Sequence, residues 1–70
     1  MEFNVEIKEC RPKFCDAGYR ELWIDGKLVM QGDAYHDKIR VAIENFLDGI
    51  KFAGNTLNIV ENEIPCKFGC

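Results

Sequence analysis

One helical pattern lies between stretches of strand pattern, and this order limits the folds open to the chain. Over residues 34–52 apolar residues recur every three or four positions and form a single stripe. The stripe contains Tyr35, Ile39, Ala42, Ile43, Phe46, Leu47 and Ile50. Asp33 suits the N-cap, and Lys51 followed by Gly54 suits the C-terminal end. The sequence therefore predicts one helix that buries one face.

Alternating apolar and polar residues predict strands on both sides of this helix. Residues 2–9 alternate strictly, with Phe3, Val5 and Ile7 on one face. Residues 20–31 form a hairpin pattern around an Asp-Gly turn signal. A last strand is expected around Leu57 and Ile59, ending before the proline at position 65. The long segment 10–19 has no periodicity and is predicted to be a loop.

Two registers compete in the hairpin. A two-residue Asp-Gly loop pairs Trp23 with Leu28, whereas a three-residue loop pairs Ile24 with Leu28 and Leu22 with Met30. We favour the second register because a slip of one residue would expose the whole apolar set. In either register, the face away from the helix is expected to carry three apolar side chains, Trp23, Val29 and Val60.

The element order predicts an α+β fold, β-β-β-α-β, in one compact domain over residues 1–70. A mixed four-stranded sheet carries the helix on one face. We expect the strand order 3-2-1-4, with the last strand parallel to the first, because this order lets the cysteines near the ends of these two strands meet. The competing order places the last strand beside the third. The predicted core consists of Phe3, Val5, Ile7, Leu22, Ile24, Leu28, Met30, Ile39, Ile43, Phe46, Leu47, Ile50, Leu57 and Ile59.

Four cysteines are the main candidates for chemistry, and the predicted order brings their segments to one edge of the sheet. Cys10 and Cys15 form one pair, and Cys66 and Cys70 form another, at spacings slightly looser than the commonest zinc sites. Nearby basic residues would favour the thiolate form. We favour a structural zinc site over free thiols, with disulfides as the third interpretation. His36 is the natural substitute for the terminal Cys70.

The same edge carries other candidate groups. Basic and aromatic residues that could stack bases and bind phosphates lie near the cysteines, namely Arg11, Lys13, Phe14, Lys67 and Phe68. Nearby acidic residues dilute this patch, and the sequence pI of about 5.0 disfavours general nucleic-acid binding. Asp33 and Asp37 flank His36, but carboxylates at a helix start are what helix electrostatics predicts. We therefore expect no catalytic residues.

A local resemblance covers residues 32–49. Gly32-Asp33-Ala34-Tyr35-His36-Asp37-Lys38-Ile39, continued by Ile43-Glu44-Asn45-Phe46-Leu47-Asp48-Gly49, resembles short uncharacterised proteins of bacteria and their prophages. This resemblance implies a bacterial cytoplasmic setting. It transfers no activity and no functional residue.

The sequence as a whole favours a non-catalytic binding or adaptor domain, with a structural zinc site as its expected cofactor. It has 70 residues, a formal net charge of −3, no apolar run that spans a membrane, and no signal-peptide pattern at its start. We expect a cytoplasmic monomer or weak homodimer with a protein partner. Two alternatives are a nucleic-acid-binding accessory protein and a thiol redox protein.

Overall fold

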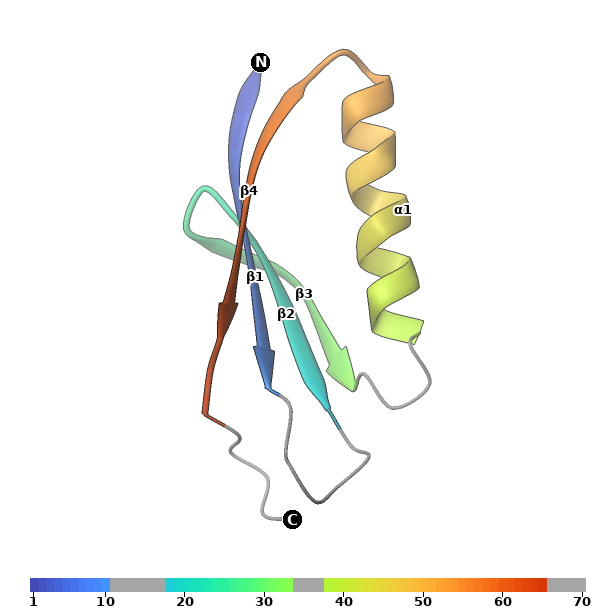
Figure 1. Cartoon of the computed structure of the whole chain (residues 1–70). Coiled ribbons are helices and arrows are strands. Elements are labelled where there is room, and N and C mark those ends of the chain that lie inside the picture. Colours follow the sequence, from blue (N-terminus) through green and yellow to red (C-terminus); the bar gives the residue numbers. More distant parts are fainter. Residues whose placement is uncertain (11–17, 34–37, 66–70) are drawn as a thin grey trace.

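The predicted α+β fold is confirmed in a computed structural model, which describes residues 1–10, 18–33 and 38–65 (Figure 1). Its elements are β1 (Glu2–Cys10), β2 (Tyr19–Ile24), β3 (Lys27–Asp33), α1 (Lys38–Phe52) and β4 (Thr56–Glu63). The four strands form one sheet in the order β3-β2-β1-β4, as expected. β1 pairs antiparallel with β2 and parallel with β4.

The core lies between α1 and one face of the sheet. Alternation in β1 buries Val5 and Ile7, and the helical stripe buries its own members against them. Leu22 lies at the centre of this layer with no exposed surface. The remaining buried members of the cluster come from the helix: Ile39, Ile43 and Leu47.

The helix lies off-centre on the sheet. It packs mainly on β3 and β2 (Figure 1). Gly32 in β3 permits this approach, because a Cβ atom placed there would lie 3.4 Å from the Ile39 Cδ1 atom. The part of the face formed by β4 is therefore less covered.

Three residues of the predicted core are exposed instead. Ile59 on β4 is 42% exposed because it lies on the part of the sheet that α1 covers less. Leu28 is exposed because it pairs with Trp23, and Trp23 pairs with Glu6, so Leu28 lies on the face of the sheet away from α1. Phe46 is exposed as well, although the helical stripe included it.

The hairpin contains both of the competing registers. Next to the turn, Trp23 pairs with Leu28, as a two-residue loop requires; beyond a register shift, Leu22 pairs with Met30. Asp25 and Gly26 both have positive φ, at 49° and 81°, which suits a tight two-residue turn. A β-bulge thus reconciles the turn with burial, since Leu22 reaches the core without a longer loop. The favoured register is correct only beyond the bulge.

The helix ends as predicted, and the first four residues of the predicted helix, 34–37, lie outside the described residues. Gly54 has φ 94°, its N–H donates to the Lys51 carbonyl (2.9 Å), and the Asn55 N–H donates to the Ile50 carbonyl (3.4 Å). This is the Schellman arrangement, which satisfies the last carbonyls. Asp33, expected as the N-cap, is the last residue of β3 and pairs with Tyr19. The segment between Asp33 and α1 lies outside the described residues.

Candidate functional site

β4 is an edge strand whose outer backbone groups point away from the sheet. The backbone groups of its even-numbered residues point toward β1. The Thr56 N–H donates to the Met1 carbonyl, and the Ile64 N–H donates to the Glu9 carbonyl, both at 2.8 Å. Groups in a parallel ladder alternate in direction from residue to residue. The N–H and C=O groups that point outward therefore belong to Leu57, Ile59, Glu61 and Glu63.

The side chains of these four residues share one face of the sheet, because strand side chains alternate between faces. Val5 pairs with Ile59 in the ladder, and Val5 is buried under the helix. The outward backbone groups of β4 thus adjoin the helix-bearing face. A segment that added beside β4 would contact these backbone groups and also the side chains on the helix-bearing face.

A groove of about 420 Å³ runs between α1 and β4 on this face. Its apolar lining comes from β1, α1 and β4 and consists of Ile7, Ile43, Leu47 and Ile59. Its charged lining contains both signs and consists of Arg20, Arg40, Lys51, Glu44, Asp48 and Glu61. The groove exists because the helix is displaced toward β3.

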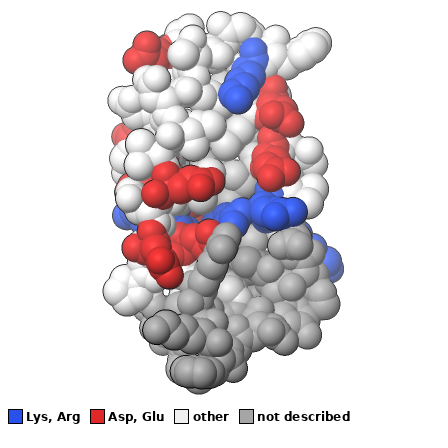
Figure 2. All heavy atoms as spheres, viewed as in Figure 1, with Lys and Arg blue, Asp and Glu red and all other residues white. Residues whose placement is uncertain are grey.

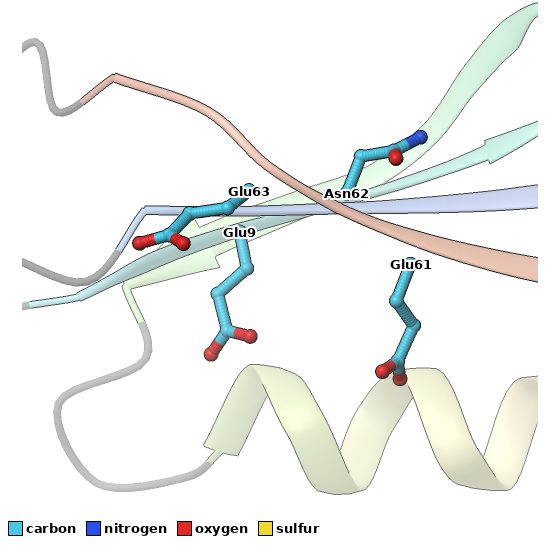
Figure 3. Close-up of a pocket in the computed structure, with 4 residues that line it drawn as sticks. All are labelled: Glu9, Glu61, Asn62 and Glu63. Carbon is cyan, nitrogen blue, oxygen red and sulfur yellow. The ribbon is translucent and has the colours of Figure 1, made fainter.

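An acidic hollow of about 220 Å³ adjoins the groove and shares Glu61 with it. Glu9, Asn62 and Glu63 complete its lining. Glu9 and Glu61 point toward the side of the sheet that carries α1, and Asn62 points the opposite way (Figure 3). Figure 2 shows acidic side chains over the lower part of β4, whereas the helix displays acidic and basic ones.

Arg20 offsets only part of this negative charge. Its Nη2 atom lies 2.7 Å from the Glu9 Oε1 atom, and both side chains are mostly buried. Its Nε atom is buried and has no hydrogen-bond partner in the part of the chain that the structure describes. Glu61 and Glu63, in contrast, are exposed and make no ion pair with any residue that the structure describes.

The opposite face of the sheet is polar, and its side chains bond one another. The Trp23 Nε1 atom donates to Glu21 (2.9 Å), and the Lys8 ammonium lies 4.4 Å from the centroid of the Trp23 ring. Asn62 donates to Glu6 (2.8 Å). Of the three apolar residues expected here, Val29 and Val60 are exposed and Trp23 is half-buried. The internal bonding makes this face a weaker candidate than the groove.

Tyr19 belongs to the same network. Its hydroxyl donates to the Glu21 Oε2 atom (2.6 Å) and lies within hydrogen-bonding distance of the Gln31 side chain. The hydrogen bond to Glu21 raises the pKa of Tyr19, because ionisation would remove the donated proton beside a carboxylate.

The predicted metal site is described only at Cys10. This side chain is 3% exposed at the end of β1, and it is disulfide-bonded. Cys15, Cys66 and Cys70, together with the substitute ligand His36, lie outside the described residues. Within the described part of the chain, no group of three or more His, Cys, Asp or Glu residues could hold a metal ion. The zinc site stays a prediction, and a disulfide sulfur is not the thiolate that zinc binds.

The other residues singled out in the sequence meet the same limit. The basic and aromatic candidates Arg11, Lys13, Phe14, Lys67 and Phe68 lie outside the described residues. The predicted gathering at one end of the strands is confirmed for Cys10 and Asp33, since Cys10 pairs with Tyr19 and Tyr19 pairs with Asp33. The groove beside β4 was not predicted, although the predicted strand order already made β4 an outermost strand of the sheet.

Comparisons with protein-family models, with curated proteins and with solved structures give no match. Among the described residues, no helix is long and apolar enough to cross a membrane.

Proposed function

We propose that this protein is a small non-catalytic binding domain that holds an extended segment of a partner protein as a fifth strand beside β4. The observation that carries the proposal is the run of outward backbone groups on β4 next to the groove. Strand addition of this kind takes its affinity from main-chain hydrogen bonds and its specificity from pockets for alternate side chains.

The two edges of the sheet differ in their suitability for this role. The hairpin bulge interrupts the pairing of β3 with β2, and bulges are one way in which proteins protect an edge from further pairing. β4 pairs with β1 in an uninterrupted register over eight residues. Its outer side therefore offers a regular ladder of donors and acceptors to a partner.

The test uses a proline that removes an outward N–H. We would select extended peptides from a random display library on the immobilised wild-type protein and measure their binding to variants. Ile59→Pro should abolish binding while the domain stays folded, because the Ile59 N–H points away from β1. Ile59→Ala separates the loss of the side chain from the loss of the donor.

A variant on the other edge supplies the control. Val29→Ala on β3 should leave the binding of the selected peptides unchanged. Peptides that bind the folded Ile59→Pro variant as well as they bind the wild type would refute strand addition at β4.

The zinc site at Cys10, Cys15, Cys66 and Cys70 is a separate proposal, which applies to the reduced chain. The proposed cytoplasmic and bacterial setting favours that reduced form, because cytosolic thiols are kept reduced. In this proposal zinc would hold the ends of β1 and β4 together and would have no part in partner binding. The proposed oligomeric state is a monomer or weak homodimer.

A further inference from the structure

We infer the side chains of the partner segment that binds beside β4. At every second position, this segment carries apolar side chains toward one end and lysine or arginine toward the other. This inference rests on the proposed function and specifies the chemistry of the partner. In the inferred complex, apolar residues lie beside Leu57 and Ile59, and basic residues lie beside Glu61 and Glu63.

Alternation determines which partner side chains are selected. In an added strand, every second side chain lies on the helix-bearing face, opposite Leu57, Ile59, Glu61 or Glu63. Side chains that lie opposite each other on paired strands have Cβ atoms about 5 Å apart, which allows direct contact. The intervening side chains face the other side of the sheet and are less constrained.

The apolar end follows from the groove. Its apolar surface comes from Ile7, Ile43, Leu47 and Ile59. Of these four side chains, Ile59 is 42% exposed and the other three are buried. The charged residues that α1 contributes to the lining balance one another, since Arg40 and Lys51 accompany Glu44 and Asp48. A space of about 420 Å³ with this lining accepts a large aliphatic or aromatic side chain.

The basic end follows from the two exposed carboxylates. Glu61 and Glu63 follow the apolar part of β4 at alternate positions, and neither forms an ion pair with a described residue. Glu9 beside them is already paired with Arg20. Complementary charges across an interface raise the association rate and set the register, so a basic segment fits here better than an acidic one.

A second copy of the chain is a poorer occupant. β4 reads TLNIVENE and contains no lysine or arginine, so a β4–β4 pair would contain four carboxylates and no basic residue from either strand. Self-pairing through this edge is therefore one of the outcomes that the experiment must be able to detect.

The experiment measures the binding of synthetic extended peptides of about ten residues to the full chain. The first peptide has two leucines and then two lysines at alternate positions, separated by threonines; a second has the reverse order, because an added strand can run in either direction. In two further peptides glutamate replaces lysine. We expect at least one lysine peptide to bind about tenfold more tightly than its glutamate counterpart at low salt, and high salt should reduce this difference.

Variants assign the effect to its residues. The double variant E61Q/E63Q should weaken the lysine peptide about fivefold and leave the glutamate peptide no weaker. Ile59→Pro should abolish the binding of every peptide. Circular dichroism and thermal unfolding of each variant confirm that the domain is folded.

The experiment distinguishes failure of the basic-partner inference from failure of strand addition itself. If lysine and glutamate peptides bind equally and Ile59→Pro abolishes both, strand addition stands and the basic partner is refuted. If no peptide binds, or if sedimentation shows a dimer that Ile59→Pro dissociates, both proposals fail in their present form.

Discussion

Two glycines near the end of α1 have opposite requirements. Gly49 lies inside the helix, and a Cβ atom added there would meet nothing within 4 Å. Gly49→Ala should therefore raise the free energy of unfolding by about 0.5–1 kcal/mol, because alanine has the higher helix propensity. Gly54 has φ 94°, so Gly54→Ala should lower it by about 1 kcal/mol. Urea denaturation of both variants tests the pair, and a change of the same sign in both would contradict this account.

The Tyr19 hydroxyl should make the free energy of unfolding depend on pH in the alkaline range. Its pKa is raised in the folded state by the hydrogen bond to Glu21, so the folded protein holds the phenolic proton more tightly than the unfolded chain. This contribution to stability is fully present below the pKa of an unfolded tyrosine, about 10, and is lost as the pH rises through the folded pKa. Stability should therefore fall across this alkaline range.

Tyr19→Phe provides the comparison for this pH response. The variant lacks the ionisable group, so its unfolding free energy should depend less on pH above 10 than that of the wild type. Denaturation at a series of pH values, with absorbance titration of the tyrosinates, measures the difference. Parallel pH curves for the two proteins would show that Tyr19 is not responsible.

At the scale of single elements, the hairpin shows where sequence patterns reach their limit. Turn chemistry at Asp25 and Gly26 favoured one register, and burial of Leu22 with Met30 favoured another. Each signal was locally correct, and a bulge satisfied both. Sequence alternation assumes a regular ladder, so it has no means of placing the extra residue that a bulge inserts.

The strand order could be predicted, whereas the site could not. The parallel direction of β1 and β4 follows from element order, because a helix that returns along the sheet joins the hairpin to β4. Their pairing was predicted from the need to bring the cysteine pairs together, and the observed strand order confirms it. The groove depends instead on how far α1 is displaced toward β3, which is set by contacts such as Gly32 with Ile39. Ile59 has the alternation of a core residue, and only this displacement leaves it exposed.

The alternation of backbone direction in β4 can be tested by stability alone. Val60→Pro removes an N–H that faces β1, whereas Ile59→Pro removes one that faces outward. Val60→Pro should therefore be more destabilising than Ile59→Pro by about 2 kcal/mol. Chemical denaturation measures both, with Val60→Ala and Ile59→Ala as references for the lost side chains. Equal losses would mean that the outward ladder is assigned to the wrong residues.

At the scale of the whole molecule, a crosslink that includes Cys10 joins the end of β1 to another part of the chain. Reduction should lower the unfolding free energy by about 2–4 kcal/mol, because the unfolded chain gains freedom. A small domain has a small free energy of unfolding, so this loss should be evident when thermal unfolding is compared with and without reductant.

Adding zinc to the reduced protein tests the metal proposal. If the four cysteines form a zinc site, about one zinc should bind per chain, stability should recover, and the thiols should become unreactive until a chelator is added. Elemental analysis and thiol titration measure both quantities. Thiols that stay fully reactive in the presence of zinc would refute the site and leave the disulfide as the stabilising feature.

The pairing of β1 with β4 also affects how the chain is made. Glu2 pairs with Thr56, so β1 cannot gain its second neighbour until the hairpin, α1 and β4 have all left the ribosome. During that interval the backbone groups that later bond β4 are open along β1, and such distant pairings form slowly. An extended segment that resembled β4 could occupy this position first. The period of synthesis before β4 emerges is therefore when the domain is most vulnerable to mispairing.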